Sequence, residues 1–149
     1  MIDDVTLRDC REEDRAFVWE VRRQALREYV AALWGWDEEA QHQKFEQRFT
    51  PAGHQIILAG GRDVGLLQVV DEGTHLVVGK IELLPEFQRQ GIGTVLLTRI
   101  LGEARSRGIP VRLQVLRTNT PARRLYERLG FVVSGESESH VHMELVARA

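Results

Sequence analysis

Residues 85–97 read "PEFQRQGIGTVLL" and join an apolar, strand-like run to a helical pattern through a loop with two glycines. The first turn of a helix leaves several backbone N–H groups without intrahelical acceptors and carries a partial positive charge. Gly91 and Gly93 let an oxyanion reach these N–H groups without meeting a β-carbon. The loop is therefore predicted to bind phosphate or pyrophosphate. The alternative is a tight turn that needs glycine only for its dihedral angles.

The sequence departs from two common phosphate-binding loops. It contains no Gly-Lys-Ser/Thr, so the lysine and the magnesium-binding hydroxyl of the NTPase loop are missing. The dinucleotide loop needs a small residue three positions after Gly93, where this chain has Leu96. What remains is the pattern Gln88-x-x-Gly91-x-Gly93 after a strand.

This pattern resembles the acetyl-CoA pyrophosphate loop of the GCN5-related N-acetyltransferase (GNAT) family, Gln/Arg-x-x-Gly-x-Gly/Ala. A second segment, "NTPARRLYERLGF" at residues 119–131, resembles the family's Asn-x-x-Ala-x-x-Leu-Tyr-x-x-x-Gly-Phe signature. The likeness extends over about residues 54–146 and is only architectural before them. It implies the GNAT acyl-CoA N-acyltransferase fold, a mixed α/β sheet of about seven strands with four helices and a splayed centre.

Composition places the chain among ordinary globular proteins. Its 149 residues predict one domain, residues 1–149, with 43% hydrophobic and 28% charged residues. The net charge of -2 argues against nucleic-acid binding. Cys10 is the only cysteine, which excludes an internal disulfide and a cysteine-based metal site. The apolar runs are too short for a membrane span and the first residues lack a secretion signal, so we expect a cytoplasmic protein without a metal.

Hydrophobic periodicity and turn residues predict the elements around the loop. Asp37 is expected to cap the second helix, and Thr120 is expected to cap the last helix with Pro121 behind it. Gly130 is expected to end that helix. The expected strands are residues 5–8, two within 55–70, 75–84, 110–116, 131–134 and 141–146, and the expected helices are about 13–33, 38–49, 93–107 and 121–129.

The family resemblance also implies where acetyl-CoA binds. Backbone amides from about Arg89 to Thr94 would hold the pyrophosphate, and the backbone of residues 81–84 would pair with the pantetheine arm like an added strand. Such pairing requires strands 75–84 and 111–116 to splay apart. The cofactor-binding residues predicted in this way are Ile81, Leu83, Leu84, Gln88, Arg89, Gln90, Gly91, Ile92, Gly93, Thr94 and Asn119. For Asn119 the alternative is a role in the loop or as a helix cap.

The implied reaction is transfer of acetyl from the thioester to a primary amine by direct attack in a ternary complex. A backbone N–H near Leu83 would stabilise the oxyanion. Tyr126 matches the residue that in many relatives protonates the departing thiolate. A phenol of pKa about 10 is a weak proton donor to a thiolate whose thiol has a pKa of about 8.5, so hydrogen bonding is the larger part of this role. The alternative is that Tyr126 is only a core aromatic.

The general base departs from the family pattern. Several relatives carry a glutamate five residues before the asparagine, where this chain has Gln114, which cannot accept the proton. Glu82 is the predicted replacement, because a carboxylate in an apolar strand is not expected to stay unpaired. The alternative is an ion pair with a neighbouring arginine. His140 and His142 share one face of the last strand, and we expect a structural role for them and no metal.

The resemblance places the acceptor site on the helices of residues 1–53, over the acetyl-CoA core of residues 54–146. Trp34 and Trp36 would line an apolar or cation-binding wall. Acidic residues 37–39 would attract a cationic amine, although a helix cap with an acidic first turn is the favoured explanation for them.

The acceptor itself stays open between a small-molecule amine and a peptide amine, and a homodimer stays open too. Gln114 keeps a second function in view, a non-catalytic acyl-CoA-binding sensor on the same fold. A third candidate, a mononucleotide-binding module, would bind ATP or NAD instead of acetyl-CoA.

Overall fold

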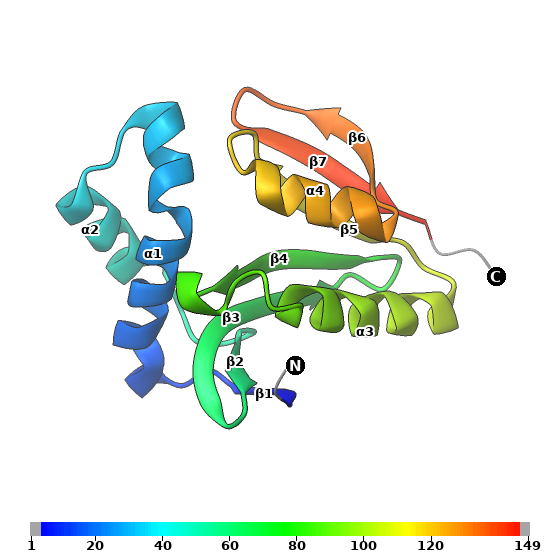
Figure 1. Cartoon of the computed structure of the whole chain (residues 1–149), viewed down its shortest axis with the longest axis horizontal. Helices are drawn as coiled ribbons and strands as arrows, with labels where there is room; N and C mark the ends of the chain where they lie inside the picture. Colours follow the sequence, from blue (N-terminus) through cyan, green and yellow to red (C-terminus); the bar gives the residue numbers. More distant parts are fainter. Residues whose placement is uncertain (1–3, 147–149) are drawn as a thin grey trace.

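The computed structural model describes residues 4–146, which form an open sheet of seven strands with helices on both faces (Figure 1). The strand order is β1-β2-β3-β4-β5-β7-β6, and only the central β4–β5 pair is parallel. The predicted mixed α/β sheet is confirmed. The strands are β1 Val5–Asp9, β2 Gln55–Ala59, β3 Arg62–Asp71, β4 Leu76–Leu83, β5 Val111–Leu116, β6 Val132–Glu136 and β7 His140–Leu145. The helices are α1 Arg15–Trp34, α2 Glu38–Arg48, α3 Ile92–Arg107 and α4 Thr120–Leu129, with short 3-10 turns at Glu12–Asp14 and Pro85–Phe87. No helix within residues 4–146 is long and apolar enough to cross a membrane.

The two faces of the sheet carry different helices because successive strand residues point to opposite sides. Ile56 and Leu66 pack with the buried side chains of α1 and α2. Their neighbours Ile57 and Leu67 pack with the first turns of α3 instead. The first half of the chain therefore covers one face, and the glycine loop with its helix covers the other.

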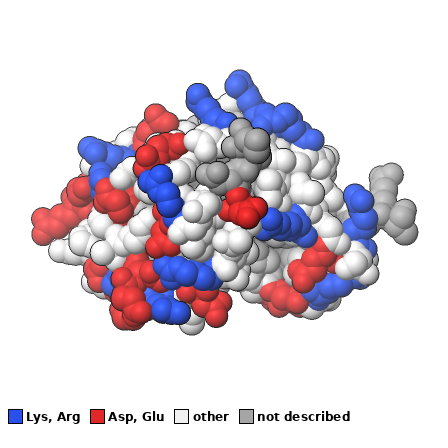
Figure 2. Space-filling view, turned by 60° about the horizontal axis from the view of Figure 1, so that its bottom comes forward, with Lys and Arg blue, Asp and Glu red and all other residues white. Residues whose placement is uncertain are grey.

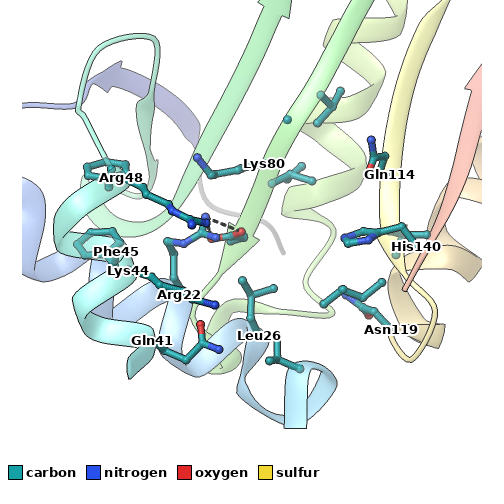
Figure 3. Close-up of a pocket in the computed structure, with 18 of the residues that line it drawn as sticks. Arg22, Leu26, Gln41, Lys44, Phe45, Arg48, Lys80, Gln114, Asn119 and His140 are labelled. Carbon is teal, nitrogen blue, oxygen red and sulfur yellow. Dashed lines mark hydrogen bonds and ion pairs between the residues drawn. The ribbon is translucent and has the colours of Figure 1, made fainter. Parts of the chain in front are cut away.

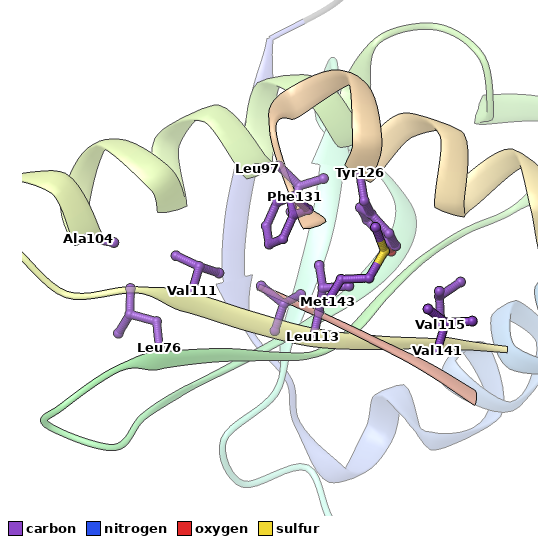
Figure 4. Close-up of a cluster of buried hydrophobic side chains, with 11 residues drawn as sticks. Leu76, Leu97, Ala104, Val111, Leu113, Val115, Tyr126, Phe131, Val141 and Met143 are labelled. Carbon is purple, nitrogen blue, oxygen red and sulfur yellow. The ribbon is translucent and has the colours of Figure 1, made fainter. Parts of the chain in front are cut away.

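A second part of the core lies between α3, α4 and strands β4, β5 and β7 (Figure 4). Tyr126 of α4 is 6% exposed and its ring meets Phe131 edge-on, with the centroids 5.8 Å apart. Leu97, Leu113 and Met143 complete the packing around the two rings. This packing fixes α4, and with it the side chains that α4 presents to the centre of the sheet.

The centre of the sheet splays, as predicted. β4 and β5 are paired only from Leu76 opposite Val111 to Val78 opposite Leu113. Beyond these three pairs the two strands diverge, so each has an edge of backbone N–H and C=O groups that the neighbouring strand does not use.

A β-bulge at Gly79, which the sequence analysis did not predict, sets the directions of the next side chains. Lys80 pairs with Gln68 and Val78 pairs with Val69, so Gly79 has no partner residue on β3. A β-carbon at Gly79 would lie 2.4 Å from the Gln68 side-chain oxygen. Because the extra residue shifts the alternation, Val78 packs in the core beside α3, whereas Lys80 and Glu82, two residues apart, both lie on the α1–α2 side of the sheet.

Helix α4 begins one residue earlier than predicted. Its N-cap is Asn119 and not Thr120, because the Asn119 side-chain oxygen accepts a hydrogen bond from the Ala122 N–H at 3.2 Å. Asparagine is among the preferred N-cap residues. Gly130 ends the helix with a φ of 107°, as predicted, whereas Pro121 is the second residue of the helix and not the first. The cap proposed for α2 is also confirmed, since Asp37 accepts from the Ala40 N–H.

Candidate active site

The glycine loop is held open by its own side chains. Gln88 donates from Nε2 to the Leu83 carbonyl at 2.9 Å, and Gln90 donates to the Glu86 carbonyl at 2.8 Å. Arg89 and Gly91 adopt left-handed backbone conformations, with φ of 63° and 84°. Gln88 thus braces the loop with its side chain, and its own N–H is used by the Pro85 carbonyl.

The backbone N–H groups of residues 89–94 have no hydrogen-bond acceptor within the described residues 4–146. They lie before and within the first turn of α3, where the helix dipole is positive. Gly93 leaves the space beside these N–H groups free. A β-carbon at this position would fill it and would lie 3.4 Å from the Leu125 side chain. The predicted anion site therefore has the geometry that an oxyanion requires.

The free edge of β4 faces the gap. The Leu84 N–H donates to the Val64 carbonyl of β3 at 3.0 Å. Along an antiparallel ladder the N–H groups alternate in direction, so the N–H groups of Leu83 and Ile81 point away from β3, toward β5. The oxyanion donor and the pairing edge predicted from the sequence are thus exposed to the gap.

A cavity of about 930 Å³ lies on the α1–α2 side of the gap. Figure 3 places Arg22, Arg48 and Lys80 on one side of it, and Gln114, Asn119 and His140 on the other. Of the two histidines on β7, only His140 lines the cavity. The full lining consists of Trp19, Arg22, Leu26, Val30, Trp34, Trp36, Gln41, Lys44, Phe45, Arg48, Phe49, Val77, Val78, Gly79, Lys80, Ile81, Glu82, Gln114, Val115, Leu116, Asn119, Tyr126 and His140.

Glu82 projects from β4 into this cavity and has a side chain only 10% exposed. Arg22 of α1 donates to its two carboxylate oxygens at 3.1 and 3.3 Å. Burial raises the pKa of Glu82, and Arg22 and Lys80 lower it by less. The predicted ion pair is confirmed. The raised pKa also brings the carboxyl closer to the neutral range that a general base needs.

Tyr126 reaches the cavity from α4, on the opposite side of the sheet. Burial raises the pKa of its hydroxyl to about 12, and the Glu82 carboxylate adds to the rise. The phenol is therefore a weaker acid than the sequence analysis assumed. Hydrogen bonding to developing charge suits it better than proton transfer does.

The acidic residues expected to attract the acceptor do not line the cavity. Asp37 caps α2, and Glu38 accepts from the Trp36 indole N–H at 2.7 Å. Trp34 and Trp36 do line the cavity, as predicted. The helix-cap explanation is therefore confirmed for Asp37, and residues 37–39 contribute no carboxylate to the cavity lining.

Sequence reasoning missed the basic residues of the cavity. Lys44 and Arg48 lie one turn apart on α2, and Lys80 follows the bulge on β4. The Lys80 ammonium lies 2.8 Å from Nε2 of His54. Elsewhere acidic and basic side chains are interspersed, as Figure 2 shows for one face. Within residues 4–146, no group of three or more His, Cys, Asp or Glu side chains is placed to hold a metal ion.

Comparison with known proteins agrees with this geometry. The model of the acetyltransferase (GNAT) family matches residues 11–131. The L-amino acid N-acyltransferase MnaT of Escherichia coli strain K12 is 29% identical over 143 residues, which cover 89% of this chain and 82% of that protein. A [ribosomal protein bS18]-alanine N-acetyltransferase of Salmonella typhimurium is 41% identical over 64 residues, 42% of this chain and 41% of that protein.

Among solved structures, the PaiA N-acetyltransferase of Thermoplasma acidophilum in complex with coenzyme A superposes with a TM-score of 0.78. It is 20% identical, and the match covers 96% of this chain and 99% of that one. The chain therefore belongs to the GNAT acetyltransferase family, which confirms the family, the fold and the enzyme class predicted from the sequence.

Proposed function

We propose that this protein transfers the acetyl group of acetyl-CoA to a primary amine by direct attack in a ternary complex. Two different sites border the gap between β4 and β5, and this arrangement is the main support for the proposal. Unpaired N–H groups of residues 89–94 and the free edge of β4 adjoin it on one side. The cavity that contains Glu82 opens on the other.

The residues proposed to hold acetyl-CoA lie in the core of residues 54–146. The N–H groups of residues 89–94 would bind the pyrophosphate, and Ile81 and Leu83 would pair with the pantetheine arm. A solved structural neighbour carries coenzyme A, which supports this assignment. Helices α1 and α2, from residues 1–53, would enclose the acceptor.

Each reacting group has a proposed partner in the chain. Acetyl-CoA supplies a thioester whose C–S bond breaks as the N–C bond to the acceptor forms. The Leu83 N–H stabilises the oxyanion that develops on the carbonyl oxygen. The Tyr126 hydroxyl donates a hydrogen bond to the departing sulfur, and Glu82 accepts the proton that the amine must lose, directly or through water. The raised pKa of Glu82 supports this last role.

The second candidate is a non-catalytic acyl-CoA sensor, favoured by Gln114 at the family's usual base position. A thiol-release assay with acetyl-CoA and a panel of primary amines separates the two functions. The relatives' names supply two kinds of acceptor for the panel, free L-amino acids and an alanine of ribosomal protein bS18. Acceptor-dependent thiol release supports the transferase. Binding of acetyl-CoA without thiol release for any amine supports the sensor.

A further inference from the structure

The cavity is strongly cationic, although the chain is slightly acidic. The whole sequence has 20 Lys and Arg against 22 Asp and Glu. The cavity lining holds Arg22, Lys44, Arg48 and Lys80, and among residues 4–146 Glu82 is its only carboxylate. Lys44 and Lys80 are also the two lysines of the chain, and both line this one cavity.

Three of these cations lack an acidic partner. Arg22 pairs with Glu82. Within residues 4–146, no carboxylate lies within the 4.0 Å ion-pair distance of Lys44, Arg48 or Lys80. Arg48 and Lys44 are exposed at the cavity, and Figure 3 shows the Arg48 side chain extending toward Arg22. The cavity therefore holds positive charge that the described residues do not neutralise.

Lys80 is held in place by a neutral partner. His54 is buried, and its Nδ1 lies 3.1 Å from the Ala52 carbonyl, so Nδ1 carries the proton and Nε2 accepts from the Lys80 ammonium. Burial and the charge of Lys80 lower the pKa of His54, which favours this neutral form. The contact orients the ammonium without cancelling its charge, as suits a group that binds an anion.

The pyrophosphate of acetyl-CoA does not account for these cations. The N–H groups of residues 89–94, which would hold the pyrophosphate, are not part of the cavity lining. Helix α2, which carries Lys44 and Arg48, packs on the face of the sheet opposite to α3 (Figure 1). The two anion-attracting regions are thus separate, and the basic part of the cavity is left for the acceptor.

We propose that the acceptor carries a carboxylate beside its amine, as a free α-amino acid does, and that Lys44, Arg48 and Lys80 bind that carboxylate. The proposal rests on the proposed function, because it assigns the acceptor of the same site. The apolar lining from Trp19, Leu26 and Val30 leaves a surface for the rest of the acceptor. A polyamine would meet repulsion in this cavity, and a neutral amine would leave the cations unpaired.

Matched acceptors test the proposal through thiol release. L-phenylalanine, L-phenylalaninamide and 2-phenylethylamine differ in structure only at the carboxylate, and L-methionine with L-methioninamide repeats the comparison with another side chain. Because this group also changes the pKa of the amine, the acceptors are compared at equal concentrations of unprotonated amine. We expect kcat/KM to be about tenfold to a hundredfold higher for each acid, the worth of one charge-assisted hydrogen bond. Equal or higher values for the amides, for 2-phenylethylamine or for spermine would overturn the proposal.

Variants that remove a single positive charge test which residues cause the preference for acids. Lys44→Gln and Arg48→Gln change exposed side chains, so the fold should persist, and each should raise KM for the acids by about tenfold and leave the amides unaffected. Arg48→Lys keeps the charge and should keep most of the preference. Arg105→Gln removes an exposed cation that does not line the cavity and is the control for net charge. The same loss in Arg105→Gln would show that the preference is not local.

A binding measurement separates failure of this proposal from failure of the proposed function. Reductive methylation with 13C-formaldehyde labels the two lysines and the α-amine, and methylation leaves the lysine charge intact. N-acetyl-L-phenylalanine added with CoA should shift the Lys44 and Lys80 methyl resonances, and N-acetyl-L-phenylalaninamide should not. Selective shifts without any turnover would retain the anion site and reject the transferase. Equal shifts, or none, from the two compounds would reject the anion site even if amines are acetylated.

Discussion

Replacing Glu82 by glutamine distinguishes a general base from an ion-pair partner. The change removes the charge and keeps both the size and an oxygen that can accept from Arg22, 3.1 Å away. Burial outweighs the nearby cations and raises the pKa of Glu82. A carboxyl whose pKa is higher in the folded state binds its proton more tightly there. It therefore stabilises the fold at acid pH, and this contribution is lost as the pH rises through the folded pKa.

The direction of this pKa shift predicts how the stability of Glu82→Gln depends on pH. One unit of pKa is worth about 1.4 kcal/mol. The variant should gain free energy of unfolding relative to the natural protein as pH rises above the unfolded pKa of about 4.3, by up to about 1.4 kcal/mol per pH unit until the folded pKa is passed. Urea unfolding over a series of pH values measures this slope. A slope of the opposite sign would mean that pairing with Arg22 dominates.

The rate should change independently of stability. A general base contributes roughly 10²- to 10⁴-fold, so thiol release at neutral pH should fall by that factor in Glu82→Gln. The deficit should shrink as the pH approaches the pKa of the amine, because free amine no longer needs the base. Glu86→Gln, at an exposed position in the turn after β4, is the matched control and should keep the natural rate. A stable Glu82→Gln protein with an undiminished rate at neutral pH would refute the assignment.

Three further changes test the acetyl-CoA site. At about a hundred times its Kd, acetyl-CoA should stabilise the protein by about 2.7 kcal/mol, and Gly91→Val or Gly93→Val should abolish the thermal shift; a full shift in both would place the phosphates elsewhere. Tyr126→Phe should lower kcat more than it weakens acetyl-CoA binding measured by calorimetry, and equal losses would make the residue a packing aromatic. Asn119→Ala should lower the free energy of unfolding by about 1 kcal/mol, because it removes the cap of α4. Asn119→Ser keeps a capping oxygen, so unchanged acetyl-CoA affinity in that variant would show that capping is the residue's whole role.

The parts of the fold that sequence predicted well are specified locally. Gly91 and Gly130 adopt φ values that favour glycine, and the residues around them form motifs whose spacing is visible in one short window. The error in the N-cap of α4 has a local cause as well. Asn119 and Thr120 are adjacent and both are suitable caps, and only the hydrogen bond to Ala122 distinguishes them.

The acceptor cavity was harder to predict because it depends on pairing between distant segments. The bulge at Gly79 exists only in the register between β3 and β4, and it puts Lys80 and Glu82 on the face opposite to Val78, which packs in the core beside α3. Lys44 and Arg48 join them from a helix more than thirty residues earlier in the chain. The sequence has only two lysines, and both line the cavity. Their rarity could have drawn attention to them, but their spacing in the sequence does not indicate that they lie in the same cavity.

The cationic cavity and the proposed base also influence each other. Arg22 and Lys80 lower the pKa of Glu82 and so oppose the effect of burial. A carboxylate bound by the cations would cancel part of their field and raise the pKa of Glu82 further. With saturating acceptor the rise of kcat with pH should therefore lie at higher pH for L-phenylalanine than for L-phenylalaninamide, because kcat reports groups in the bound complex. Superimposable profiles for the two acceptors would mean that the carboxylate binds too far from Glu82 to affect its proton.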